Sequence, residues 1–184
     1  MSRAAGDKLD AILAGTPRLW KGRRRNQAQD VLATGHAALD RHLPGGGWPR
    51  GAVTELVTAR PGLGELSLLF PALAAAGGPG CWLLLIDPPW IPYPASLYGH
   101  GLCLERLLLI RTPGAGESLW ACEQALRGMP QGIVLAWPRD IRFAALRRLQ
   151  LAAEDQGGTA FLFRPESAAA AAKVLGCQPA EIML

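Results

Sequence analysis

The stretch between residues 55 and 69 constrains the fold of this chain more than any other part. An apolar run of β type at residues 53–57 enters a turn rich in Gly and Pro, and an apolar helical pattern leaves that turn. Strand, glycine-rich loop and helix in this order form the framework of a phosphate-binding loop. The stretch therefore predicts a strand and a helix, joined by this loop, at the centre of the fold.

The loop has lost the residues that bind a nucleotide. In alignment with the pattern G-x-x-x-x-G-K-[ST], Ala59 stands at the first glycine and Gly64 matches the second. Glu65 stands at the lysine and Leu66 at the Ser or Thr, while Gly62 lies inside the loop. In a working loop the lysine neutralises the β- and γ-phosphates and the hydroxyl holds Mg²⁺, so both contacts are missing.

Glu65 and Leu66 each oppose nucleotide binding for a physical reason. Two opposite charges about 4 Å apart attract by roughly 4 kcal/mol at an effective dielectric constant near 20, and a carboxylate at the lysine position reverses the sign. A leucine cannot ligate Mg²⁺, which takes oxygen ligands. We therefore expect no nucleotide or other cofactor and no ATPase activity, and the loop serves as a connection between strand and helix.

Length and composition indicate one globular domain. The chain has 184 residues, of which 49% are hydrophobic and 18% charged, which suits a substantial core. We expect neither a membrane span nor a signal peptide, because no apolar run approaches roughly 20 residues and the first ten residues lack an apolar region. The four cysteines show no C-x-x-C spacing, which argues against a metal site and for reduced thiols in the cytoplasm.

Residues 1–30 read as an N-terminal region ahead of the domain. Residues 7–14 carry an apolar stripe of Leu9, Ile12 and Leu13, which predicts a short amphipathic helix. A helix of this length is not stable alone in water. It must therefore dock, either on its own domain or on another chain.

A basic cluster follows the predicted helix. It consists of Lys21, Arg23, Arg24 and Arg25, next to Trp20, in a chain with a net charge of +4. A basic cluster beside an aromatic side chain can contact the backbone of a nucleic acid, and a solvated linker is the alternative. We expect at most weak, salt-sensitive DNA binding through this cluster.

Beyond residue 30 the predicted strands and helices alternate. The expected strands are residues 52–57, 81–86, 107–110, 132–137 and 159–163, and one that starts near residue 182. The expected helices are residues 34–40, 64–76, 95–100, 117–127, 140–156 and 167–175, and residues 44–51 read as a turn-rich loop. Alternation of this kind implies a parallel sheet covered by helices on both faces. Residues 31–184 should therefore form a three-layer α/β domain, and we expect the natural protein to continue past the last strand.

Three motifs resemble the start of a RecA-type ATPase core. They are Thr34-Gly35-x-x-x-Leu39-Asp40, Leu43-Pro44-Gly45-Gly46-Gly47-x-Pro49-x-Gly51 and Val53-Thr54-Glu55. The resemblance implies a RecA-like core of the P-loop NTPase type with a mainly parallel sheet. RecA-like cores commonly pass an N-terminal helix and linker onto a neighbouring copy, so the resemblance also implies a homo-oligomer linked through the helix at residues 7–14.

A more specific resemblance covers nearly the whole chain and is to the ImuA family, RecA-like accessory proteins of inducible translesion DNA synthesis. The segments that carry it are residues 19–22 (LWKG), 44–52 (PGGGWPRGA), 87–94 (DPPWIPYP), 120–127 (WACEQALR) and 146–154 (LRRLQLAAE). The chain also resembles the related SulA family of cell-division inhibitors, through Gly51-Ala52-Val53-x-Glu55-Leu56, Ile86-x-Pro88-Pro89 and Glu123-x-Ala125-Leu126-Arg127.

Two further positions depart from the RecA-type ATPase pattern. Pro89 stands near the place of the catalytic glutamate, and Trp137 stands where an aspartate that helps to hold Mg²⁺ would end a buried strand. Asp87 alone cannot rebuild a Mg²⁺ site. Positions needed for one reaction are therefore absent together at three separate places.

The resemblances imply three functions of different classes. The first is a non-catalytic scaffold in a DNA-damage-inducible mutagenic assembly, with ImuB as direct partner and an error-prone replicative-type polymerase and the sliding clamp as indirect partners. The second is a SulA-type SOS inhibitor that binds the division protein FtsZ. The third, a working ATPase, is opposed by Glu65, Leu66 and Trp137. The motif of residues 34–51 and the basic cluster favour the scaffold.

Overall fold

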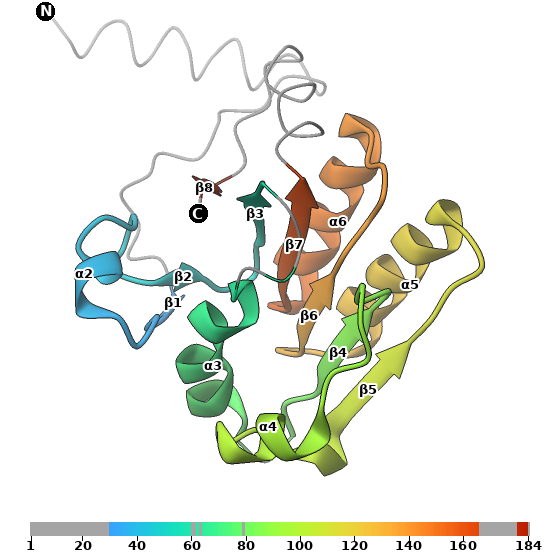
Figure 1. Ribbon diagram of the computed structural model, residues 1–184. Helices are drawn as coiled ribbons and strands as arrows, with labels where there is room; N and C mark the ends of the chain where they lie inside the picture. The colour runs from blue at the N-terminus through green and yellow to red at the C-terminus, as the bar shows by residue number, and fades with distance from the viewer. Residues whose placement is uncertain (1–29, 60–61, 63, 79, 166–179, 184) are drawn as a thin grey trace, which may run out of the picture.

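A six-stranded parallel sheet forms the centre of the protein (Figure 1). The computed structural model describes residues 30–59, 62, 64–78, 80–165 and 180–183. The strands are β3 (Val53–Thr58), β4 (Leu83–Ile86), β5 (Leu107–Ile110), β6 (Ile133–Ala136), β7 (Thr159–Pro165) and β8 (Ala180–Met183). They lie in the order β5-β4-β6-β7-β3-β8, and each neighbouring pair is parallel.

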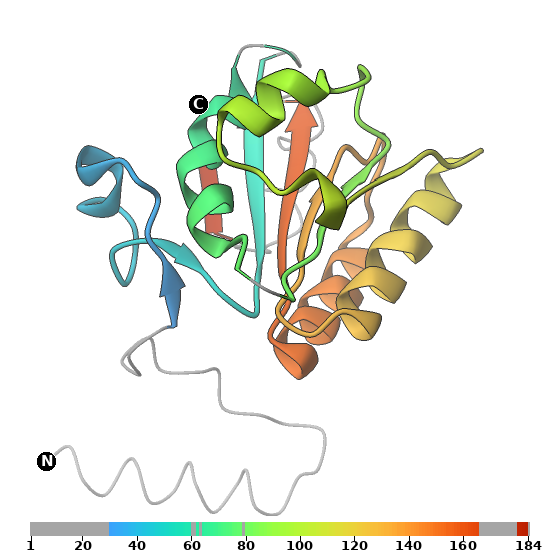
Figure 2. The ribbon, with the colours of Figure 1, turned by 90° about the horizontal axis from the view of Figure 1, so that it is seen from below.

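Helices cover both faces of this sheet (Figure 2). α3 (Glu65–Ala76) and α4 (Pro94–Gly99) lie on one face, and α5 (Ala115–Gly128) and α6 (Phe143–Gln156) lie on the other. A short 3₁₀ helix, Leu104–Arg106, leads into β5. The expected three-layer α/β arrangement is confirmed, whereas the assignment to a RecA-like P-loop core stays a prediction.

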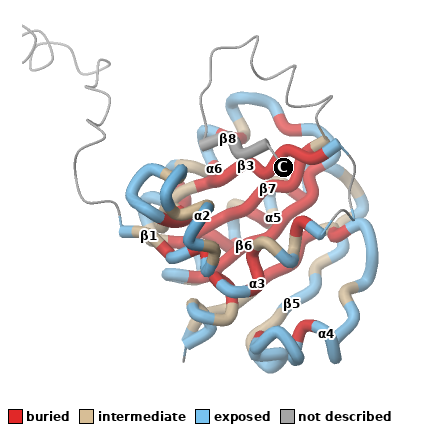
Figure 3. Tube along the Cα trace, turned by 60° about the vertical axis from the view of Figure 1, so that its left-hand side comes forward, coloured by how far each residue is buried: buried red, intermediate tan, exposed pale blue. Residues whose placement is uncertain are grey.

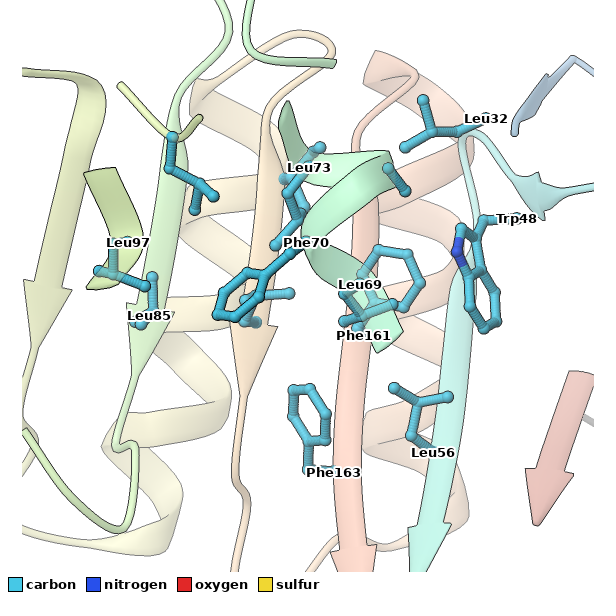
Figure 4. Packing of buried hydrophobic residues seen from close by; sticks show 14 of the residues in the cluster. Leu32, Trp48, Leu56, Leu69, Phe70, Leu73, Leu85, Leu97, Phe161 and Phe163 are labelled. Carbon is cyan, nitrogen blue, oxygen red and sulfur yellow. The ribbon is translucent and has the colours of Figure 1, made fainter. Parts of the chain in front are cut away.

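Each face of the sheet has its own hydrophobic core. On the α3 side, Leu69 and Phe70 of α3 pack with Leu56 of β3 and Phe161 of β7, all of them buried (Figure 4). On the other side, the apolar faces of α5 and α6 pack on the central strands, with Leu126 and Leu149 among the buried residues. Because the central strands are apolar on both faces, their sequence shows continuous hydrophobic runs, as is typical of parallel sheets.

A second, two-stranded antiparallel sheet contradicts the predicted turn-rich loop at residues 44–51. It pairs β1 (Val31–Leu32) with β2 (Trp48–Pro49), and α2 (Ala37–Asp40) lies between them in the chain. Trp48 has no exposed surface, and its ring meets Phe161 edge to face with centroids 5.4 Å apart. We call residues 31–49 the N-terminal module. Its strands of two residues are too short for a sequence periodicity to reveal.

The N-terminal module also touches α3 through a glycine. Gly35 has φ +80°, and a Cβ atom at this position would lie 2.3 Å from Cβ of Pro71 in α3. Any other residue would therefore combine backbone strain with a clash. Pro71, which lies inside α3, and Gly35 together fix how the module sits on the core.

Most expected elements appear within a few residues of their predicted bounds, and β5 has the bounds that were predicted. The helix expected at residues 34–40 is shorter and begins at Ala37, because the Thr34 hydroxyl accepts a hydrogen bond from the His36 N–H in a turn that precedes it. The helices expected at residues 7–14 and 167–175 lie outside the described residues. Among the described helices, none has both the length and the apolar character to cross a bilayer.

A buried ion pair joins the two central strands β3 and β7. Nη1 of Arg164 donates to Oε1 of Glu55 at 2.6 Å, and the two side chains are only 4% and 1% exposed. Removing one member of a buried ion pair leaves a charge without compensation, which commonly costs about 3–5 kcal/mol. Glu55 is therefore required for stability although its pairing cannot be seen in the local sequence.

We expect Glu55→Gln to lower the free energy of unfolding by about 3–5 kcal/mol, measured by urea denaturation. The exposed Glu154→Gln is the matched control and should change it by less than about 0.5 kcal/mol. The double variant Glu55→Leu with Arg164→Met should lose less free energy of unfolding than Glu55→Gln does, because it leaves no unpaired charge buried. A loss below 1 kcal/mol in Glu55→Gln would show that the pair contributes little.

Candidate functional site

A cavity of about 620 Å³ lies at the carboxyl ends of the parallel strands. Chain order reverses in the sheet between β4 and β6, since β5 lies beyond β4 while β7 lies beyond β6. Open α/β sheets place their ligand sites at this kind of switch point, outside the carboxyl ends of the strands. Asp87 after β4 and Trp137 after β6 both line the cavity. The cavity is therefore the position at which this architecture usually binds a ligand.

The glycine-rich loop holds a carboxylate of the protein itself. The N–H of Gly62 donates to both carboxylate oxygens of Glu65, at 2.9 and 3.1 Å. Glu65 is the first residue of α3 and is only 7% exposed. A helix N-terminus and the loop before it favour negative charge, and here Glu65 supplies that charge from within the chain.

Gly64, Ala59 and Leu66, the other positions aligned with the nucleotide-binding pattern, occupy a turn, an exposed strand end and a packing site. Gly64 has φ +94° and directly precedes α3, so it supplies the left-handed turn into the helix. Ala59 is exposed at the end of β3. Leu66 packs against the core on the α3 side and does not line the cavity. Leu66, which aligns with the Mg²⁺-binding hydroxyl of the ATPase pattern, is thus a packing residue.

An aromatic pair lies where the aspartate of the ATPase pattern would end β6. Trp137 is 9% exposed and stacks on Phe163 of β7, with ring centroids 4.4 Å apart and an interplanar angle of 10°. Pro89 lines the cavity from the loop that follows β4. None of the side chains of Trp137, Phe163 and Pro89 offers an oxygen ligand for a cation, so these residues give the cavity an apolar wall.

Asp87 ties the end of β4 to the loop after β5. Its carboxylate accepts hydrogen bonds from the N–H of Thr112 at 2.7 Å and from its hydroxyl at 2.6 Å. Burial alone would raise the pKa of the Asp87 carboxyl, but the hydrogen bonds from Thr112, a contribution from Ser118 and the positive charge of Arg111 together lower it. Asp87 also has φ +52°, a backbone conformation that few residues other than glycine adopt. Its carboxylate is therefore a structural acceptor.

Cys122 of α5 lies behind this site and is wholly buried. Burial, together with the negative charge of Asp87, raises the pKa of its thiol to about 12. The thiol is therefore protonated at neutral pH and unsuited to nucleophilic or redox chemistry.

Positive charge remains at the mouth of the cavity. Arg111 and Arg139 are exposed and line it, whereas Arg164 reaches it from the buried pair with Glu55. The two acids that line the cavity, Glu65 and Asp87, accept hydrogen bonds from loops of the chain itself. The exposed rim is therefore basic, and sequence patterns gave no signal for it because the arginines come from different loops.

Next to the cavity, four large apolar side chains are exposed. The loop from β4 and α4 present Trp90, Ile91, Tyr93 and Tyr98, which are 60%, 77%, 73% and 72% exposed. We call them the aromatic surface. Patches of this kind on a folded domain mark interaction sites more often than isolated exposed side chains do.

The aromatic surface is fixed to the core and to the loop. Leu97 of α4 is buried, and His100 after α4 stacks on Phe70 of α3 with centroids 4.2 Å apart. The Trp90 ring lies so close to Gly62 that a Cβ atom there would come within 2.9 Å of it. The sequence analysis treated this segment only as a Pro-rich break, so the aromatic surface is a feature that it missed.

Several predicted site residues lie outside the described residues. These are Leu9, Ile12 and Leu13 of the expected helix, and Lys21, Arg23, Arg24 and Arg25 of the basic cluster. Their roles in self-association and in DNA binding stay predictions. Within the part of the chain that the structure describes, no three His, Cys, Asp or Glu side chains come together as a metal site.

We expect Asp87→Asn to destabilise the protein at neutral pH by on the order of 1 kcal/mol, since hydrogen bonds to a charged acceptor are stronger than neutral ones. A lowered folded-state pKa gives stability above the unfolded-state pKa of about 3.9, and that stability is lost as the pH falls through the folded-state value. The difference from wild type should therefore disappear in strong acid. Urea denaturation from pH 7 to pH 2 measures it, and a difference that does not change with pH would contradict the charged-acceptor role.

Comparison with known proteins relates this chain to SulA. It is 32% identical over 108 residues to the cell division inhibitor SulA of Edwardsiella piscicida, which covers 58% of this chain and 64% of the relative. It is 27% identical over 99 residues to the cell division inhibitor SulA of Photorhabdus laumondii, over 54% and 56% of the two chains. The chain thus matches less than two thirds of the length of these curated relatives. No family profile matches it.

A solved structure agrees with these sequence matches. The crystal structure of SulA from Pseudomonas aeruginosa superimposes with a TM-score of 0.50 and 30% sequence identity. The match covers 97% of that SulA chain but only 61% of this one. It supports the SulA side of the predicted resemblance, and it does not separate SulA from the related ImuA. The chain therefore belongs to the family of SulA-related proteins.

Proposed function

We propose that this protein is a non-catalytic, partner-binding protein of the SOS response that inhibits cell division by binding FtsZ, as SulA-type proteins do. The observation that carries the proposal is the similarity to SulA, which extends over 97% of a solved SulA chain at 30% identity. Two curated relatives with the same name support it.

The geometry of the cavity supports a function without catalysis. Glu65 fills the loop that would hold phosphate, and Trp137 stacks on Phe163 where a cation ligand would lie. With these two places occupied by side chains of the protein, two groups that bind Mg²⁺ and a triphosphate in an ATPase have no counterpart here, which supports the proposal. Binding of another protein is the function for which the chain retains suitable surface.

The aromatic surface is the part of the chain best suited to contact FtsZ. Tryptophan and tyrosine dominate the residues that carry binding energy at protein interfaces. Trp90 and Tyr93 are exposed on a segment whose backbone is fixed by Leu97 and by several prolines, so little conformational freedom is lost on binding. The basic rim formed by Arg111 and Arg139 adjoins the same cavity and would favour an acidic partner surface.

A second candidate function is the scaffold of a mutagenic polymerase assembly, in which the chain binds ImuB and, through it, an error-prone polymerase and the sliding clamp. The observation that favours it is that the solved SulA matches only 61% of this chain. The N-terminal module carries the motifs that resemble RecA-type and ImuA proteins, and it is tightly fixed by Trp48 and Gly35. The module therefore gives the motifs that resemble ImuA proteins a defined structure.

The two candidates are separated by capture of purified FtsZ and purified ImuB on the immobilised full chain, side by side. We expect FtsZ to be retained. Retention of ImuB alone would overturn the proposal in favour of the scaffold, and retention of neither would contradict both.

The aromatic surface is tested with Trp90→Ala and the matched control Trp120→Ala. Both tryptophans are about equally exposed, at 60% and 62%, but Trp120 lies on α5, on the opposite face of the sheet. Truncating a tryptophan at the centre of an interface costs at least about 2 kcal/mol, or roughly 30-fold in Kd. Titration calorimetry should show this loss for Trp90→Ala only, and equal affinities for both variants would exclude the aromatic surface.

A further inference from the structure

The cavity at the carboxyl ends of the strands carries exposed positive charge. Arg111 and Arg139 line it and are exposed. Within the described part of the chain, neither of them forms a salt bridge. The two acids that line the cavity, Glu65 and Asp87, already accept hydrogen bonds from backbone N–H groups of the chain. The cavity therefore favours a ligand that carries negative charge.

Trp137 supplies a hydrogen-bond donor at the same place. It lines the cavity and is 9% exposed, and its buried Nε1–H has no acceptor among the described residues. An indole N–H can only donate, and a buried donor without an acceptor costs free energy. An oxygen atom of a ligand in the cavity would remove that cost. Two exposed guanidinium groups and an N–H donor together favour a carboxylate, whose oxygens carry negative charge and accept hydrogen bonds.

The cavity adjoins the aromatic surface along the chain. Pro88 and Pro89 line the cavity and directly precede Trp90. The Trp90 ring also lies against Gly62 of the glycine-rich loop. In Figure 3 the central strands β3, β6 and β7 are almost wholly buried, whereas α4 is exposed except at Leu97. A protein that binds Trp90 and its exposed neighbours therefore lies beside the mouth of the cavity.

We propose that the partner protein inserts an acidic side chain, an aspartate or a glutamate, into this cavity. Its carboxylate is held by Arg111 and Arg139 and accepts a hydrogen bond from the Nε1–H of Trp137. The inference rests on the proposed function, in which the partner that covers the aromatic surface is FtsZ. The volume of about 620 Å³ exceeds that of one side chain, so the cavity also has room for the tip of the loop that carries the acid.

A protein is favoured over a free anion as the source of the carboxylate. A free anion must be held by the cavity alone, whereas contacts at Trp90 and Tyr93 deliver an acidic side chain of a bound protein at a high effective concentration. A partner without an acid at this point would cover the arginines and leave them without a counter-charge. The cavity would therefore discriminate against such a partner.

The rates of association and dissociation test whether the carboxylate enters the cavity. Arg139→Gln removes a lining charge, and Arg142→Gln is the matched control, because Arg142 is an exposed arginine that does not line the cavity. Loss of a rim charge changes mainly the association rate, whereas loss of one partner of a charge pair buried in the complex raises the dissociation rate. Biolayer interferometry should show FtsZ leaving immobilised Arg139→Gln at least about tenfold faster than wild type or Arg142→Gln.

The same experiment separates failure of this inference from failure of the proposed function. If Arg139→Gln and Arg142→Gln slow association alike and leave dissociation unchanged, the arginines only attract the partner and no side chain enters the cavity. That result would overturn the inference and leave the proposed function intact, since FtsZ still binds. Absence of FtsZ binding to the wild-type chain would overturn the proposed function and the inference with it.

The donor is tested with Trp137→Phe, which keeps an aromatic ring beside Phe163 and removes the N–H. Trp48→Phe is the matched control, because Nε1 of Trp48 is also buried without an acceptor among the described residues and Trp48 does not line the cavity. Thermal melting checks that both variants are folded. FtsZ should dissociate about tenfold faster from Trp137→Phe than from Trp48→Phe, and equal rates would exclude the N–H from the site.

The source of the carboxylate is tested by NMR at the Nε1–H resonance of Trp137, which is identified by its absence from the spectrum of Trp137→Phe. Addition of FtsZ to the labelled full chain should move this resonance downfield, because the N–H gains an oxygen acceptor. Succinate, a small dicarboxylate, is the probe for a free anion. No shift with FtsZ would contradict insertion, and a saturable shift with succinate alone would assign the cavity to a free carboxylate instead.

Discussion

The hydrogen bonds from the Gly62 N–H to the Glu65 carboxylate are the contact on which the site depends. A glycine-rich loop ahead of a helix presents N–H groups and a positive dipole end, which require a negative partner. In this chain the first residue of α3 provides it. The Gly62 N–H is therefore bonded within the chain, and Gly62 also lies against the Trp90 ring.

Other charged side chains at the cavity are likewise bonded to groups of the chain itself. Asp87 is held by Thr112, and Arg164 is held by Glu55. Trp137 and Phe163 stack where a cation would need oxygen. These charged groups join strands and loops of the chain itself. Among the described residues around the cavity, the aromatic surface and the basic rim are exposed, which suits recognition of a protein.

Local sequence patterns predicted the layers of this fold, but they did not predict contacts between residues far apart in the sequence. Continuous apolar runs such as residues 107–110 marked the strands, because buried parallel strands are apolar on both faces. The N-terminal module was missed because strands of two residues carry no periodicity. Glu55 and Arg164 are 109 residues apart in sequence, so only the three-dimensional fold reveals that they pair. The exposure of Trp90 depends likewise on where the Pro-rich loop lies.

The most direct measurement is an NMR titration of the full chain with Mg-ATP, followed at the backbone amide of Gly62. If Glu65 already satisfies the loop, this resonance and those of neighbouring residues stay unchanged as Mg-ATP is added in excess. The same amide should shift clearly in Glu65→Ala, which confirms that the resonance reports on the carboxylate. A saturable shift at Gly62 in the wild-type protein would show that the loop binds nucleotide, and would contradict a function without catalysis.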